Sequence, residues 1–310
     1  MKKLLLISLL IFSCGNPGNP PNTTNENQVT EDQVQQLKDM RLITKYWAQT
    51  GDNGMLSTDA DDPQGDAMLW AGLSCIAGDD SQCQAAVRSV RYDGMVCRSP
   101  NLCDRETNAS SRDMFLGALL TITKTKNEIM ANKILAYLES NNHQLCDNDD
   151  DNRCDLSLPQ HGAAWATMRK VYTYIGLPVT WEMIFYDMGD EYVLRLESQF
   201  AGIKPSGIQA DYEAHLVGVE LLIRQRTGYW SEDLQRTANT LRTRQPDNPF
   251  YEYLTNGKTK KAAELTLAKC PRNKPEYSHS WAWQRNETKE AWKESMGWDC
   301  IFMANLLIGQ

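Results

Sequence analysis

The chain has 310 residues, of which 41% are hydrophobic, and its formal net charge at pH 7 is −8. An acidic chain is repelled by nucleic acid and by anionic lipid, so neither is expected as a partner. Its length allows one large domain with a full hydrophobic core.

The N-terminus has the pattern of an export signal. Residues 1–3 are a short cationic start, and residues 4–12 are an apolar run too short to span a bilayer. The segment Ile11-Phe12-Ser13-Cys14 resembles the lipobox of bacterial lipoproteins. This resemblance implies cleavage ahead of Cys14 and lipid on that cysteine. Because Gly15 rather than Asp follows, it also implies the outer membrane, where the cell has one. The alternative is an ordinary signal peptide with an incidental cysteine.

A polar tether follows the predicted lipid site. Residues 15–27 are rich in Gly, Asn, Pro and Thr and contain no apolar side chain that could be buried. We therefore expect a signal peptide at 1–13, a lipidated tether at 14–29 and one domain at 30–310. No stretch after residue 14 is long and apolar enough to span a membrane.

The remaining eight cysteines form an even set, as expected for disulfides in an oxidising compartment. Many pairings are open, and we favour sequence neighbours because short loops close easily. A zinc site is the alternative, but the usual CxxC spacing is absent. The expected pairs are Cys75/Cys83, Cys97/Cys103, Cys146/Cys154 and Cys270/Cys300.

Helical periodicity predominates in the domain. Thr30 and Gln33 can form a capping box ahead of a helix that runs to Trp47. The segment 179–186 is the best candidate for a strand, and β signals are otherwise few, so we predict an all-α fold. Further helices are expected to begin near Asp66, Gln82, Ser111, Lys126, His161, Gln209, Ser231, Asn248, Lys258, Glu287 and Gly297.

A weak repeat gives this helical domain more shape. Four segments place an Asp just ahead of an apolar helix rich in small residues: 65–73, 112–120, 210–218 and 298–306. Their spacing is about 45–50 residues or about twice that, which predicts two further members near His161 and Asp247. We therefore expect six helix pairs, each with an apolar inner helix. Small residues such as Gly72, Gly117 and Gly218 would allow these inner helices to approach closely.

Six helical hairpins in a closed ring form an (α/α)6 toroid. In layout the chain resembles the toroid scaffolds of several glycoside hydrolases and polysaccharide lyases. The resemblance implies that the loops before the inner helices converge over a central cavity. An open helical solenoid fits the spacing almost as well, and the chain matches no catalytic motif of one such family. It contains no HExxH, GxSxG or P-loop pattern.

Asp66 and Asp113 are the leading candidates for catalysis. Two carboxylates in one cleft shift each other's pKa, so one can hold a proton while the other stays charged, as glycoside hydrolysis requires. Arg112 could bind a substrate carboxylate. The alternatives are that the aspartates cap helices and that the arginine pairs with an acidic residue.

Aromatic and histidine side chains could shape the same cavity. Tryptophan rings can stack on sugars, although large α proteins also use tryptophan for core packing, and a histidine can act as a base or sit in the core. The predicted substrate-binding residues are Trp70, His161, Trp165, Tyr212, His215, His279 and Trp281.

An acidic loop between Cys146 and Asp155 is a candidate calcium site. It resembles the Asp-rich calcium loops of thrombospondin-like and EF-hand-like repeats, with Asn152 where glycine is usual. Ca²⁺ takes six to eight oxygen ligands, and aspartates at alternating positions can supply them. We expect such an ion to be structural and not catalytic. The alternative is a solvated acidic loop without a metal. The predicted ligands are Asp147, Asp149, Asp151 and Asp155.

Together these features predict an exported, lipid-anchored lipoprotein with a carbohydrate-active domain, either a glycoside hydrolase or a lyase. No cofactor is required for this chemistry beyond a structural Ca²⁺. The main alternative is a non-catalytic surface lipoprotein that binds a glycan, peptide or protein. A third is a structural component of the cell envelope.

Overall fold

A computed structural model of the chain describes residues 27–47, 67–103, 110–145, 162–187, 189–200, 203–204, 207–208, 212–270 and 297–309. These residues are helical apart from short turns, isolated bridges and one ladder in which Ile203 pairs with Ile208. The predicted all-α class is confirmed for the described residues. Within the described ranges, no helix has both the length and the apolarity needed to cross a membrane.

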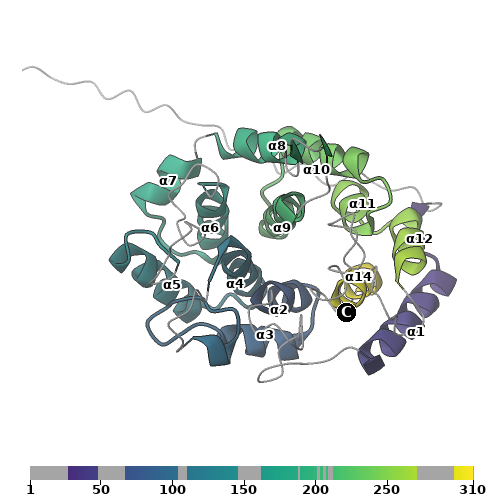
Figure 1. Ribbon diagram of the computed structural model, residues 1–310, viewed down its shortest axis with the longest axis horizontal. Coiled ribbons are helices and arrows are strands. Elements are labelled where there is room, and N and C mark those ends of the chain that lie inside the picture. Colours follow the sequence, from purple (N-terminus) through teal and green to yellow (C-terminus); the bar gives the residue numbers. More distant parts are fainter. Residues whose placement is uncertain are drawn as a thin grey trace, which may run out of the picture.

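The helices lie in an inner and an outer group around the middle of the molecule (Figure 1). We call the first group the inner helices: α2 (Ala67–Ile76), α4 (Arg112–Thr125), α6 (Gly162–Ile175), α9 (Tyr212–Thr227), α11 (Pro249–Asn256) and α14 (Trp298–Ile308). The outer helices are α1 (Glu31–Trp47), α3 (Asp80–Arg88), α5 (Glu128–Ser140), α7 (Trp181–Asp187), α8 (Asp190–Phe200), α10 (Glu232–Arg244) and α12 (Lys260–Lys269). A short 3-10 helix, η3, spans Pro100–Leu102, and the ladder joins β1 (Ile203–Lys204) to β2 (Gly207–Ile208).

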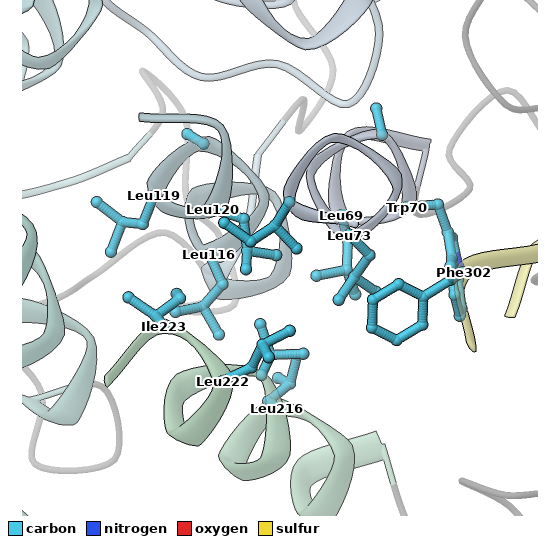
Figure 2. Packing of buried hydrophobic residues seen from close by; sticks show 14 of the residues in the cluster. Leu69, Trp70, Leu73, Leu116, Leu119, Leu120, Leu216, Leu222, Ile223 and Phe302 are labelled. Atoms are coloured by element: carbon cyan, nitrogen blue, oxygen red, sulfur yellow. The ribbon is translucent and has the colours of Figure 1, made fainter. Parts of the chain in front are cut away.

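Neighbouring inner helices pack against one another. Helix α2 contacts α4 and α14, and α9 contacts α4, α6 and α11. Outer helices cover the seams between them, since α3 touches both α2 and α4, and α12 touches both α11 and α14. Aliphatic side chains fill the space among α2, α4 and α9 (Figure 2), including Leu69, Leu73, Leu116, Leu120, Leu216 and Leu222.

Capping residues define where several helices begin. At α1 the Gln33 amide donates to Thr30 Oγ1 at 3.2 Å, and the Thr30 amide donates to Gln33 Oε1 at 3.1 Å. This reciprocal pair is the predicted capping box, and it satisfies two amides that have no partner within the helix. Four other N-cap side chains accept similar bonds from backbone amides in the first turns of their helices. They are Asn127, Ser231, Asn248 and Thr259.

The prediction of a strand at 179–186 is wrong, because most of this segment forms α7. Thr180 Oγ1 accepts a hydrogen bond from the Met183 amide at 3.4 Å, which favours a helical first turn. Met183 is fully buried, and Asp187 at the end of α7 pairs with Lys170 Nζ at 2.5 Å. Packing on α6 therefore overrides the strand propensity of the aromatic and β-branched residues. Helix α8, which follows, was not predicted either.

Three of the four expected disulfides lie within the described residues. Cys75 bonds to Cys83 between α2 and α3, and Cys97 bonds to Cys103 in the loop before α4. The Cys270–Cys300 bond joins the end of α12 to α14. Each bond therefore connects an inner helix to its neighbour or stiffens a loop that leads into one.

Candidate functional site at the start of the inner helices

Two of the repeated aspartates lie in the first turn of inner helices. Asp113 is the second residue of α4 and is half-buried, and Asp299 is the second residue of α14 and is buried. Neither is the N-cap, because that position belongs to Ser111 in α4 and to Gly297 in α14. A carboxylate in a first turn lies at the positive end of the helix dipole, which favours its charged form.

Helices α2 and α4 approach until their backbones touch. A Cβ atom added to Gly117 would lie 2.4 Å from the Met68 carbonyl oxygen, and one added to Gly72 would lie 2.3 Å from the Gly117 carbonyl oxygen. This confirms the prediction that small residues allow close packing of inner helices. The contact holds α2 and α4 at a fixed spacing near Asp113.

An aromatic group fills the space between four inner helices. The ring centroids of Trp70 and His215 are 6.1 Å apart, and those of His215 and Phe250 are 5.5 Å apart. Phe302 adds an edge contact to Phe250 at 5.5 Å, and Figure 2 shows Phe302 beside Trp70. Trp70 is completely buried and His215 is 4% exposed. These two predicted binding residues therefore contribute to the core of the folded chain.

Trp165, another predicted stacking residue, is also buried. It lies in α6 with 1% of its surface exposed, and its ring is 5.3 Å from that of His143. His143 follows the end of α5 and has a positive φ of 67°. Trp165 therefore packs α6 against the end of α5.

Arg112 lies at the centre of a buried polar cluster that we call the Arg112 cluster. Its Nη2 donates to Glu220 Oε1 at 2.6 Å and to Glu197 Oε2 at 2.9 Å, and its Nε donates to Glu220 Oε1 at 3.2 Å. The Thr167 hydroxyl donates to Glu220 Oε2 at 2.9 Å and accepts from Arg224 Nη2 at 3.1 Å. The cluster comprises Arg112, Thr167, Asp190, Glu197, Glu220 and Arg224.

The residues of this cluster come from four helices, α4, α6, α8 and α9. Helix α8 supplies Asp190 and Glu197. Asp190 Oδ2 lies 2.5 Å from Arg224 Nη1, and the Arg224 side chain has no exposed surface. The guanidinium that was expected to bind substrate is therefore held by two glutamates. The structure contains the alternative that was predicted for Arg112, an ion pair with acidic residues, which are Glu197 and Glu220.

Sequence reasoning missed the other members of the cluster, although one signal was present. Glu220 stands inside the apolar run 216–223, where every other residue is apolar or glycine. A charge in such a run must be buried with a partner. Its partner Arg112 is 108 residues away, and no local pattern predicts that distance.

The carboxyl of Glu197 has its pKa raised above the ordinary value of 4.5, because it is buried and because Glu220 lies beside it. Arg112 acts in the opposite direction and does not outweigh these effects. A carboxyl whose pKa rises on folding stabilises the fold below its unfolded pKa, and this contribution is lost as the pH rises through the folded pKa.

We therefore expect Glu197 to make the wild-type melting temperature fall as the pH rises above about 4.5, and we expect Glu197→Gln to remove this contribution. At pH 7 the variant should melt at or above the wild-type temperature, because the amide carries no buried charge. Melting curves by circular dichroism from pH 4 to 8 provide the measurement. Glu232→Gln on the exposed face of α10 is the control and should keep the wild-type profile. A much lower melting temperature for Glu197→Gln at pH 7 would contradict this account.

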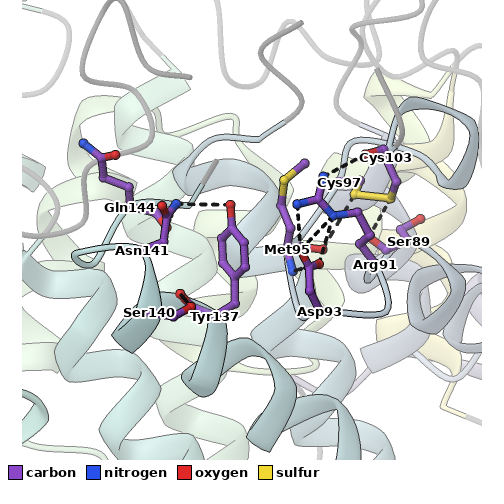
Figure 3. A network of polar contacts seen from close by, with 10 residues as sticks. All are labelled: Ser89, Arg91, Asp93, Met95, Cys97, Cys103, Tyr137, Ser140, Asn141 and Gln144. Carbon is purple, nitrogen blue, oxygen red and sulfur yellow. Dashed lines mark hydrogen bonds and ion pairs between the residues drawn. A yellow bond between two sulfur atoms is a disulfide. The ribbon is translucent and has the colours of Figure 1, made fainter. Parts of the chain in front are cut away.

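Residues 91–103, which precede α4 in the chain, form a turn held by several polar contacts (Figure 3). Arg91 donates from Nε to Asp93 Oδ1 at 2.9 Å and from Nη2 to Asp93 Oδ2 at 2.7 Å, and its Nη1 donates to the Cys103 carbonyl at 3.2 Å. The hydrogen bond from Arg91 lowers the pKa of the Asp93 carboxyl. Gly94 has a φ of 106°, and a Cβ there would lie 2.0 Å from the Lys133 carbonyl oxygen. The turn therefore packs tightly against α5, and its tip exposes Tyr92.

Several predicted residues lie outside the described residues, so their roles stay predictions. Tyr212 is the first residue of α9, and nothing is described of its side chain. In the ranges that the structure describes, no group of three or more His, Cys, Asp or Glu side chains could hold a metal ion. The predicted residues outside these ranges are Cys14, Asp66, Cys146, Asp147, Asp149, Asp151, Cys154, Asp155, His161, His279 and Trp281.

Comparison with models of known protein families, with curated proteins and with solved structures finds no match to the chain.

Proposed function

We propose that the protein is an exported lipoprotein, anchored to a membrane through lipid on Cys14, and that its domain acts on carbohydrate as a glycoside hydrolase or polysaccharide lyase. Asp66 and Asp113 are the proposed acid–base carboxylates. The outer membrane is the proposed location because Gly15 follows the lipidated cysteine. A structural Ca²⁺ in the loop from Asp147 to Asp155 belongs to the same proposal.

The helix layout supports an (α/α)6 toroid. The inner and outer helices of Figure 1 recur with the spacing of the sequence repeat, and α6 and α11 begin where its two missing members were expected. In a toroid all inner helices start at one end of the ring. The first turns of α4 and α14, with Asp113 and Asp299, would then face a common opening.

The observation that carries the catalytic proposal is the backbone contact between α2 and α4. Gly117 packs on the backbone of Met68 and Leu69 in the first turn of α2, so the N-terminal halves of α2 and α4 lie side by side. Asp66 directly precedes Ala67, the first residue of α2, and Asp113 is half-buried in the first turn of α4. This arrangement suits two carboxylates that act as a pair.

The test is Asp113→Asn, assayed for release of reducing sugar or unsaturated product from a panel of polysaccharides. We expect the wild type to turn over at least one glycan and the variant to lose about 100-fold or more in kcat with its melting temperature preserved. Asp233→Asn is the matched control, because Asp233 is also half-buried and second in its helix but belongs to the outer helix α10. That variant should keep full activity.

Two outcomes would count against the enzymatic proposal. Equal turnover by Asp113→Asn and wild type would remove Asp113 from the mechanism. A glycan that raises the melting temperature of the wild type without any product would instead support the non-catalytic binding protein.

A further inference from the structure

The first turn of α4 is held in an unusual way. Its N-cap, Ser111, makes no side-chain capping bond, so the usual means of fixing a helix start is absent there. The first helical residue is Arg112, which is 7% exposed. A cation at the positive end of a helix dipole is unfavourable, and burying it adds a desolvation cost. The contacts of Arg112 must offset both terms.

Glu220 makes the strongest of these contacts. It lies in the middle of α9 with a side chain that has no exposed surface. One of its oxygens accepts two hydrogen bonds from Arg112, and the other accepts from the Thr167 hydroxyl. The start of α4 is thereby tied to α9 and α6 by bonds to a carboxylate, which are about twice as strong as bonds between neutral groups.

The contacts of Arg112 keep its side chain charged and restrict its position. The neighbouring carboxylates of Glu220 and Glu197 raise the pKa of Arg112 above its ordinary value, although burial alone would lower it. Arg112 therefore stays charged at every physiological pH, and the fully buried Glu220 is the carboxylate that it contacts twice. A long side chain held at both Nε and Nη2 leaves the backbone of residue 112 little freedom.

We propose that Glu220 is a positioning residue that, through Arg112, fixes the first turn of α4 and so the direction of the Asp113 carboxylate. Residues 112 and 113 are adjacent in one helical turn, so the orientation of the first determines the Cα–Cβ direction of the second. The catalytic consequence rests on the proposed function, whereas the mechanical link between Glu220 and the start of α4 does not.

A second buried glutamate provides a close control. Glu252 in the inner helix α11 is 2% exposed, accepts from Asn256 Nδ2 at 2.6 Å and lies 3.6 Å from Arg242 Nη1. It resembles Glu220 in burial and in facing an arginine, but these two partners belong to α11 and α10 and not to α4. Substituting Gln at each site removes one buried charge and keeps the shape of the side chain.

The experiment compares Glu220→Gln with Glu252→Gln by amide hydrogen exchange of the full-length protein, read at Phe115, Leu116 and Gly117 in α4. We expect exchange there to be about tenfold faster in Glu220→Gln and unchanged in Glu252→Gln. Thr167→Val, which removes only the hydroxyl behind Glu220, should give a smaller increase at the same amides. If Glu220→Gln does not fold, Thr167→Val tests the same link between Glu220 and the start of α4.

A second measurement uses the glycan on which Asp113 is tested. Glu220→Gln should lower kcat and alter its pH profile while KM stays the same, and Glu252→Gln should change neither. Equal exchange at the start of α4 in both glutamate variants would overturn the positioning role. If hydrogen exchange changes as expected but no glycan is turned over, the mechanical link stands and the proposed enzymatic function fails.

Discussion

Gly117→Ala should lower the free energy of unfolding by about 2 kcal/mol or more, although alanine is the better helix former. Alanine in a helix gains about 1 kcal/mol over glycine. Against this, the new Cβ would lie 2.4 Å from the Met68 carbonyl oxygen and 2.9 Å from the Leu69 Cα. Both neighbours are backbone atoms, so α2 and α4 must move apart, and overpacking of this kind costs about 1–3 kcal/mol before the lost contacts of the surrounding leucines are counted.

Thermal melting of Gly117→Ala should show a fall of about 4 °C or more. Gly218→Ala is the control, because its new Cβ would meet side chains, at 3.0 Å from Phe250 and 3.1 Å from Tyr251. Side chains can shift where backbone cannot, so this variant should change by less. A Gly117→Ala protein that melts at or above the wild-type temperature would show that α2 and α4 are not in backbone contact.

Loss of the Cys270–Cys300 bond should be the most costly of the disulfide removals. The two cysteines are 30 residues apart, and closing a loop of this length in the unfolded chain is worth about 3–4 kcal/mol. Cys75 and Cys83 are only 8 residues apart, which gives about 2–3 kcal/mol. The longer loop also connects α12 to α14, whose contacts the bond supports.

Paired Cys→Ala substitutions at each bond, followed by thermal melting, compare the two contributions. We expect a fall of about 6 °C for Cys270→Ala with Cys300→Ala and a smaller fall for Cys75→Ala with Cys83→Ala. A reversed order would mean that native-state strain, and not loop length, determines the stability that these bonds provide.

Local rules predicted the start of α1 and the close packing of α2 on α4. Thr30 and Gln33 lie three residues apart, so the capping box is visible without knowledge of the fold. Gly72 and Gly117 belong to segments that repeat, and the repeat itself indicates which helices must be neighbours. The first prediction depends on residues within one helical turn, and the second depends on one period of the sequence repeat.

Predictions that needed long-range information were less successful. Arg112 was expected to face a cleft, and it is held by Glu197, which is 85 residues away on an outer helix. Trp70 and Trp165 were expected to offer ring faces to a ligand, and both are buried. A sequence pattern places a residue on a helix face, but only the packing of that helix decides whether the face meets solvent or protein.

Helix α1 packs against α14, so the two ends of the described chain are neighbours (Figure 1). Arg41 Nη1 donates to Asn305 Oδ1 at 2.7 Å across a separation of 264 residues. Part of the buried face of α1 is therefore covered only when α14, far along the chain, packs against it. Such closure has a large entropic cost that is recovered only at the end of folding, so the final contacts form late. Adjacent ends also mean that the order of helices along the chain could be permuted without disturbing their arrangement in space.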